Sequence, residues 1–246
     1  MTEGAATIQQ RLARDMVTLQ SQLEKPNHWS IAATLATLYG KTFPGSDGAS
    51  AADWYKMAAT AADRSGDASA RVWVRGRAAI VLGYEGAGLT LADRFAAEAL
   101  ELSEKPTIGR LNAIMGRAHV AAIRGDRTSA YRLLNQGRRT FEQLDSDTKP
   151  PSDYSVPEWR MGVFMSLLAA RLGDQKLYET VSAEALRTLP DSLPRFRTHL
   201  RLHQALVIAR SGDKAGGVRA AKAAMSALPP ERHSLTLRLL VNEVSA

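Results

Sequence analysis

The chain has 246 residues, of which 45% are hydrophobic and only 6% aromatic, and 32 Lys and Arg against 25 Asp and Glu give a formal net charge of +7. The absence of cysteine excludes disulfides, a thiolate nucleophile and a Cys-ligated metal, and is typical of a cytoplasmic protein. No apolar run approaches the ~18 residues of a membrane span, and the N-terminus lacks the pattern of a secretion signal, so we expect a cytoplasmic protein without membrane association.

The first 25 residues carry apolar side chains at intervals of three and four, which predicts a leading amphipathic helix that ends before Pro26. Further helical segments follow, separated by short breaks rich in glycine, proline, serine or aspartate. They pair into about five helix hairpins, at residues 27–64, 68–104, 107–144, 157–189 and 194–228. With a capping helix at 231–246, the pattern predicts an all-α fold of about 12 helices in a single domain over residues 1–246.

The breaks between the predicted helices have a recurring chemistry. Gly125-Asp126 separates the two helices of the third hairpin, where glycine suits a left-handed helix end and aspartate suits the start of the next helix. Gly173-Asp174 has the same composition. The segment 145–157 contains three prolines, which predicts an irregular loop.

Glycines at the predicted turns recur at a nearly constant spacing. Gly86, Gly125, Gly173 and Gly212 lie 39, 48 and 39 residues apart (125 − 86, 173 − 125 and 212 − 173). The longer interval contains the proline-rich segment. Small residues recur in the second helix of the hairpins, and a proline follows that helix in two of them, so each hairpin is interpreted as one repeat unit.

These features resemble the tetratricopeptide repeat (TPR), a helix pair with small residues at fixed positions and a closing proline. The units are longer than the usual length of about 34 residues and lack the early Trp and Tyr of that family. The run AADRSGDASARVWVRGRAAIVLGYEG, followed by ADRFAAEAL and GRAHVAAIRGDRTSAYRLL, also resembles the C-terminal sensor region of actinomycete helix-turn-helix (XRE-type) transcriptional regulators. The resemblance covers about Ile31 to Val244 and implies a right-handed superhelix of antiparallel helix pairs.

In such regulators the repeat region receives a signal or mediates dimerisation, while a separate N-terminal helix-turn-helix domain reads DNA. The resemblance therefore implies a regulatory module that binds a peptide or protein, with homodimerisation as a further role. Direct DNA binding is not expected, because Pro26 lies where the turn of a helix-turn-helix would be. The basic residues are also spread over every helix instead of forming one patch.

In a stack of helix pairs the first helix of each pair lines the concave wall, where a peptide or a partner helix binds. Alignment of the hairpins places eleven residues on that wall: Arg77, Tyr84, Asn112, Met115, His119, Arg160, Leu167, Arg171, His199, Leu206 and Arg210. Their arginines and histidines favour an acidic or carboxylate-bearing partner.

Residues that could carry chemistry do not form a catalytic or metal-binding motif. His199 and His203 have the spacing of two ligands on one helix face, but no glutamate follows the first histidine and no third ligand is evident. No serine lies in a nucleophile-elbow pattern. We therefore expect no cofactor, no metal and no enzymatic activity. The alternative is an enzyme or accessory subunit of specialised peptide natural-product biosynthesis that holds its substrate in the groove.

Overall fold

Glycine and aspartate residues at the turns set where several helices end and begin. In the computed structural model, Gly125 and Gly173 have positive φ angles of 79° and 65°, a conformation that glycine adopts without steric cost. Asp126 and Asp174 then cap the following helices, and each side chain accepts a hydrogen bond of 3.0 Å from the backbone N–H three residues further on. The predicted turn chemistry is confirmed at both turns.

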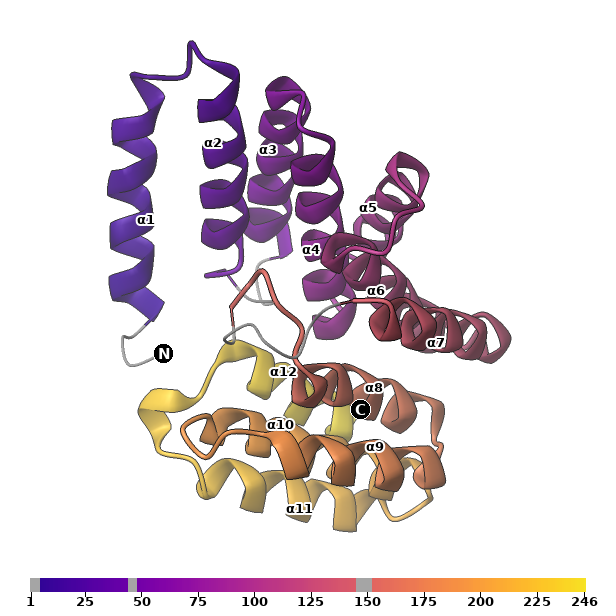
Figure 1. The fold of residues 1–246 in the computed structure, drawn as a ribbon. Helices are drawn as coiled ribbons and strands as arrows, with labels where there is room; N and C mark the ends of the chain where they lie inside the picture. The colour runs from indigo at the N-terminus through magenta and orange to yellow at the C-terminus, as the bar shows by residue number, and fades with distance from the viewer. Residues whose placement is uncertain (1–4, 44–47, 145–151) are drawn as a thin grey trace. The chain divides into compact units, whose positions relative to one another are not determined.

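The structure describes residues 5–43, 48–144 and 152–246 (Figure 1). These residues form twelve α-helices, one short 3-10 helix and no strand, which confirms the all-α class. None of these helices is long and apolar enough to cross a membrane. Residues 1–4 of the predicted leading helix and residues 145–151 of the predicted loop lie outside the described residues. The chain divides into two compact units, residues 1–117 and 118–246, and the single superhelical array stays a prediction.

Unit 1 is built from helix hairpins. It contains α1 (Ala5–Gln20), α2 (Pro26–Gly40), α3 (Gly48–Ser65), α4 (Ala68–Glu85), α5 (Leu89–Leu102) and the first part of α6 (Ile108–Ile123). Helices α2 and α3 form one hairpin and α4 and α5 the next, while α1 packs on α2 (Figure 1). A Cβ atom at Gly76 of α4 would lie 1.9 Å from the carbonyl oxygen of Gly109 in α6. Glycine at these positions therefore allows the two helices to approach closely.

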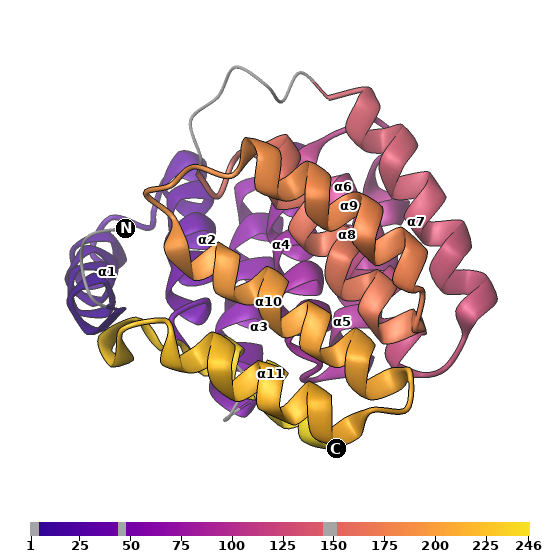
Figure 2. The same cartoon turned by 90° about the horizontal axis from the view of Figure 1, so that it is seen from below.

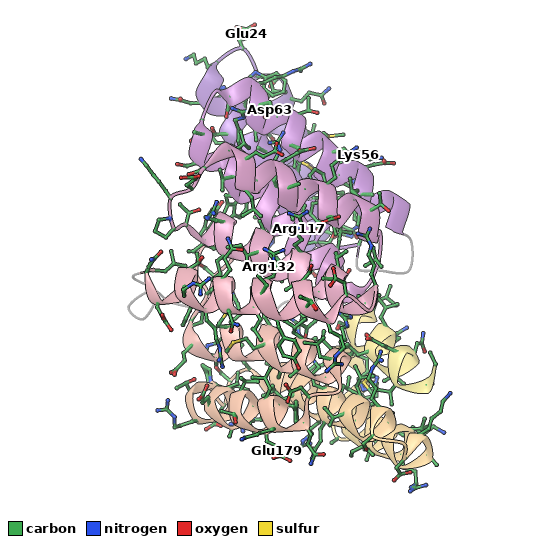
Figure 3. All side chains as sticks on the ribbon, turned by 90° about the vertical axis from the view of Figure 1, so that its right-hand side faces the viewer. Glu24, Lys56, Asp63, Arg117, Arg132 and Glu179 are labelled. Atoms are coloured by element: carbon green, nitrogen blue, oxygen red, sulfur yellow. The ribbon has the colours of Figure 1, made fainter. Side chains whose placement is uncertain are left out.

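A buried arginine joins the two hairpins of unit 1. The guanidinium of Arg75 in α4 donates to Asp63 of α3 at 2.7 Å and to Glu98 of α5 at 2.8 Å. Asp63 lies near the end of α3 (Figure 3). Partial burial opposes the ionisation of Asp63, but hydrogen bonds from Arg75 and Arg71 outweigh that effect and hold the pKa of its carboxyl below the usual value. This ion-pair network stabilises the contact between the hairpins.

Unit 2 surrounds one helix that is buried along most of its length. It contains the rest of α6, α7 (Arg127–Glu142), α8 (Glu158–Leu172), α9 (Gln175–Thr188), α10 (Pro194–Arg210), α11 (Lys214–Ser226), the 3-10 helix η1 (Pro230–Arg232) and α12 (Leu235–Ser245). The hairpins α8–α9 and α10–α11 lie side by side (Figure 2), and α12 packs against α10 and α11. Every residue of α8 from Met161 to Leu172 is buried. Helix α8 is therefore the centre of the unit.

Candidate functional site

The eleven residues predicted to line a groove are mostly interior. Nine are buried, namely Arg77, Tyr84, Asn112, Met115, His119, Leu167, Arg171, His199 and Leu206. Arg160 is half-buried and donates to the carbonyl oxygen of Ser155 at 2.8 Å, in the segment that precedes α8. Arg210 is exposed at the last residue of α10. Contact of these residues with a ligand stays a prediction, and the structure shows that most of them are engaged in packing.

Three helices of unit 2 bring His119 and Arg171 together with Glu243. The guanidinium of Arg171 in α8 donates to both carboxylate oxygens of Glu243 in α12, from Nε and Nη2 at 2.9 Å each. Its Nη1 lies 3.1 Å from Nδ1 of His119 in α6. The side chain of Arg171 is only 1% exposed, against 23% for Glu243. Two parallel hydrogen bonds to a carboxylate are the strongest way to neutralise such a buried guanidinium.

The contact with Arg171 fixes the protonation of His119. A guanidinium has only donors, so Nδ1 of His119 must accept and cannot carry a proton. His119 is therefore a neutral imidazole with its proton on Nε2. It acts as a hydrogen-bond acceptor for the buried charge.

A serine and two more histidines extend this cluster along α8 and α10. Oγ of Ser166 lies 2.8 Å from Nδ1 of His203 and also donates to the carbonyl oxygen of Val163 at 3.0 Å. Because a hydroxyl has one proton, the arrangement that satisfies both contacts has His203 donating from Nδ1 to Ser166. His199, one turn earlier on α10, stacks on Phe196 with ring centroids 5.6 Å apart.

Burial lowers the pKa of all three histidines. It lowers the pKa of His199 to about 3, with a smaller contribution from the positive charge of Arg195. Burial also holds the pKa of His203 well below its usual value, and repulsion from His199 and His119 in their protonated forms and from Arg171 adds to this effect. For His119 the causes are burial and then Arg171. The three imidazoles are thus neutral at neutral pH.

These contacts favour a structural role for the interior cluster. Ser166 and His203 lie within the distance of a nucleophile and its base, but in the arrangement that satisfies both contacts Ser166 donates to a carbonyl of its own helix and His203 donates to Ser166, which leaves the hydroxyl without a base. Both side chains are fully buried. Over the described part of the chain, no group of three or more His, Asp or Glu side chains is placed to hold a metal ion. We name this set the interior polar cluster: His119, Ser166, Arg171, His199, His203 and Glu243.

An open pocket of about 290 Å³ lies elsewhere in unit 2, between α7, α8 and α9. It is lined by Arg138, Phe141, Glu142, Glu158, Met161, Gly162, Met165 and Glu184. The apolar side chains come from α7 and α8, and carboxylates come from all three helices. None of the eleven residues predicted from the sequence belongs to it. We call it the α7–α9 pocket.

Packing of the three helices holds this pocket open at one end of α7. Near the N-terminus of α7, Arg127 donates to the carbonyl oxygen of Leu172, and Tyr131 donates to Asp174 at 2.7 Å. These bonds attach that part of α7 to the turn between α8 and α9. A Cβ at Gly162 would lie only 2.6 Å from Cβ of Ala185, so α8 and α9 are in close contact below the pocket. The pocket opens beside the other end of α7.

The sequence did not reveal the α7–α9 pocket because its residues do not recur at any regular interval along the chain. Its carboxylates lie on three different helices, and each one taken alone is what a solvated helix face ordinarily carries. The burial of the predicted wall had a visible signal, however. Most of the residues from Met161 to Leu172 are apolar or small on every side of the helix, which is typical of a fully buried helix and not of one that lines a polar groove.

Comparisons with protein-family models, curated proteins and solved structures found no match for this chain.

Neutralising Glu243 should destabilise the protein. The variant Glu243→Gln keeps the shape of the side chain but leaves the charge of Arg171 without its carboxylate. We expect a loss of about 2 kcal/mol in the free energy of unfolding, less than for a fully buried pair because Glu243 is partly exposed. Urea titration followed by circular dichroism measures this loss.

The double variant Arg171→Met/Glu243→Gln should lose less stability than the sum of the two single variants, by about 1 kcal/mol or more, because the buried charge is gone. The exposed Glu179→Gln is the matched control and should stay within about 0.5 kcal/mol of the unchanged protein. A Glu243→Gln variant as stable as this control would contradict the role given to the ion pair.

Stability should fall with acidification in a window set by the buried histidines. Their pKa values are lowered in the folded state, so below the unfolded value of 6.5 only the unfolded chain takes up protons at these positions. Above pH 6.5 the neutral state of these histidines takes nothing from the free energy of unfolding. Below pH 6.5 the free energy of unfolding falls progressively, for His199 down to a pH of about 3. Each histidine should contribute a slope of about 1.4 kcal/mol per pH unit within that window.

Urea unfolding at a series of pH values from 7.5 to ~4.5 tests this dependence, above the range in which most carboxyls titrate. In the variant His199→Leu the free energy of unfolding should depend less steeply on pH, by the contribution of one proton, about 1.4 kcal/mol per pH unit. Stability that stays constant across this range would refute the neutral state assigned to the three imidazoles.

Proposed function

We propose that the protein is a non-catalytic helical module that binds a segment of a peptide or protein partner. Two observations support the proposal: helices are paired into hairpins through Gly-Asp turns, and the sequence resembles TPR proteins. The observation that carries it is the α7–α9 pocket, which is open and combines an apolar floor with polar groups at its rim. Binding sites combine apolar side chains with a few polar groups that orient the ligand.

The disposition of the titratable groups supports binding over catalysis. Three of the histidines and Ser166 are buried in the interior polar cluster, where Ser166 bonds to His203 and His119 bonds to Arg171. The lining of the open pocket contains the half-buried Phe141 and the buried Met161 and Met165 instead. Methionine adapts its shape to a partner and is common at surfaces that bind peptides.

A regulatory role in the cytoplasm completes the proposal. It is supported by the resemblance to the sensor region of transcriptional regulators and by the absence of cysteine, which suits a reducing compartment. In this proposal the partner occupies the α7–α9 pocket of unit 2, and homodimerisation is a further role that the resemblance implies.

Selection from a random peptide library should yield binders that occupy the pocket. In the chain labelled at its methionine methyl groups, such peptides should shift the NMR signals of Met161 and Met165, which line the pocket, and leave Met57 of α3 unchanged. Truncating the apolar floor with Phe141→Ala should weaken binding about tenfold, since buried aromatic side chains contribute most at interfaces.

The matched control for this test is Leu186→Ala on α9, an exposed leucine that does not line the pocket. It should bind the selected peptides with unchanged affinity. A selection that yields no binder, or binders that shift no signal of Met161 or Met165, would count against the proposed function.

A further inference from the structure

Resting on the proposed function, we infer that the α7–α9 pocket takes a lysine or arginine side chain presented by the partner segment. The site would thus recognise a basic side chain, and not the acidic partner that the sequence pattern favoured. Four features of the pocket carry this inference: its local charge, the pairing of its carboxylates, the orientation of its arginine and the chemistry of its floor.

The local charge of the pocket is opposite to that of the chain. Three glutamates and one arginine line it, which gives a formal charge of 1 − 3 = −2. The whole chain has a formal net charge of +7. Glu142, Glu158 and Glu184 come from α7, α8 and α9 respectively, so three separate helices direct a carboxylate to one opening. Such a potential attracts a cation and repels a carboxylate-bearing ligand.

Two of these carboxylates are available for a ligand. Glu158 forms an exposed ion pair with Arg187 at 3.3 Å. Glu142 and Glu184 make no ion pair with any of the described residues. Both are exposed at the rim, where an incoming ammonium or guanidinium loses little hydration before it is paired.

The one arginine of the pocket does not neutralise the rim. Nε of Arg138 donates to the sulfur of Met165 at 3.4 Å, and within the described ranges its guanidinium pairs with no carboxylate. A thioether sulfur is a weak acceptor. The guanidinium thus contacts the floor of the pocket and pairs with neither Glu142 nor Glu184, so its single positive charge offsets only part of their negative charge.

The floor of the pocket suits the aliphatic part of a basic side chain. Met161 and Met165 are buried beneath it, and Phe141 is half-buried at its edge. Lysine and arginine bury their methylene groups on apolar surface while the charged end stays in contact with polar groups. A purely apolar side chain would fill the same floor but would leave the carboxylates of the rim unused. The combination thus favours a cation on a long aliphatic stem.

Binding of positional peptide libraries to the full chain tests this inference. The probes are four libraries of blocked peptides with randomised flanking positions and a central residue fixed as lysine, arginine, norleucine or glutamate. Fluorescence polarisation should show lysine and arginine binding about threefold more tightly than norleucine, as expected of exposed ion pairs, and glutamate most weakly. Raising the salt concentration should reduce this preference, because the rim is exposed.

The double variant Glu142→Gln/Glu184→Gln should abolish the preference for lysine and arginine and leave the affinity for norleucine unchanged. The matched control is Glu179→Gln, which removes a carboxylate from the exposed surface of α9 outside the pocket (Figure 3) and should keep the full preference. Circular dichroism and urea unfolding establish that the variants remain folded.

The outcomes separate the ligand class from the proposed function. Tightest binding by the norleucine or glutamate library, with shifts in the NMR signals of Met161 and Met165, would overturn the inference that the pocket takes a basic side chain. It would leave the proposed binding function intact. A preference for lysine and arginine that persists in the double variant would overturn the role of Glu142 and Glu184. If no library shifted Met161 or Met165, both the inference and the proposed function would be overturned.

Discussion

The buried charge of Arg171 is the constraint on which the interior of unit 2 depends. Its side chain is almost inaccessible to water, and a guanidinium left unpaired there would cost several kcal/mol. Glu243 neutralises it with two hydrogen bonds, and His119 accepts from a third nitrogen. A single side chain of α8 therefore fixes the positions of α12 and of the last part of α6. The neighbouring histidines stay neutral chiefly because they are buried, and the positive charge of Arg171 adds to this effect for His119 and His203.

This arrangement explains where unit 2 can bind a partner. The polar residues of the first helices, which the sequence pattern assigned to a groove, are mostly buried in the interior, where His119 and Arg171 bond to each other. Helix α8 is buried along most of its length, and only its first residues reach the surface, with Glu158 exposed and Arg160 half-buried. The opening is completed by the second helices α7 and α9. A binding surface formed in this way has carboxylates at its rim although the chain as a whole is basic.

The sequence predicted the helices well because the signals for helices are local. Apolar periodicity, glycine with a positive φ and aspartate caps all act within one or two turns, as at Gly125-Asp126. The candidate site depended instead on contacts between distant residues. Arg171 and Glu243 are 72 residues apart, and no spacing rule indicates that they pair. Arginine side chains on helices are usually exposed to solvent, so the burial of Arg171 could not be inferred without knowing that it pairs with Glu243.

The same limit applied to the pocket, whose carboxylates are brought together only by the packing of α7 against the α8–α9 hairpin. What the sequence could have indicated is the apolar character of α8 on every side, which excludes a helix that is half exposed along a groove. That observation would have moved the expected binding surface from the first helices to the second. The charge preference of the site would still have required the structure.

A crystal structure of the full chain with a lysine-containing peptide selected for binding is the most direct test of the central claim. We predict that the ammonium lies within about 3 Å of a carboxylate oxygen of Glu142 or Glu184, with the methylene groups against Met161 and Met165. A peptide seated on the residues of the predicted groove, or a lysine directed away from the α7–α9 pocket, would contradict the account.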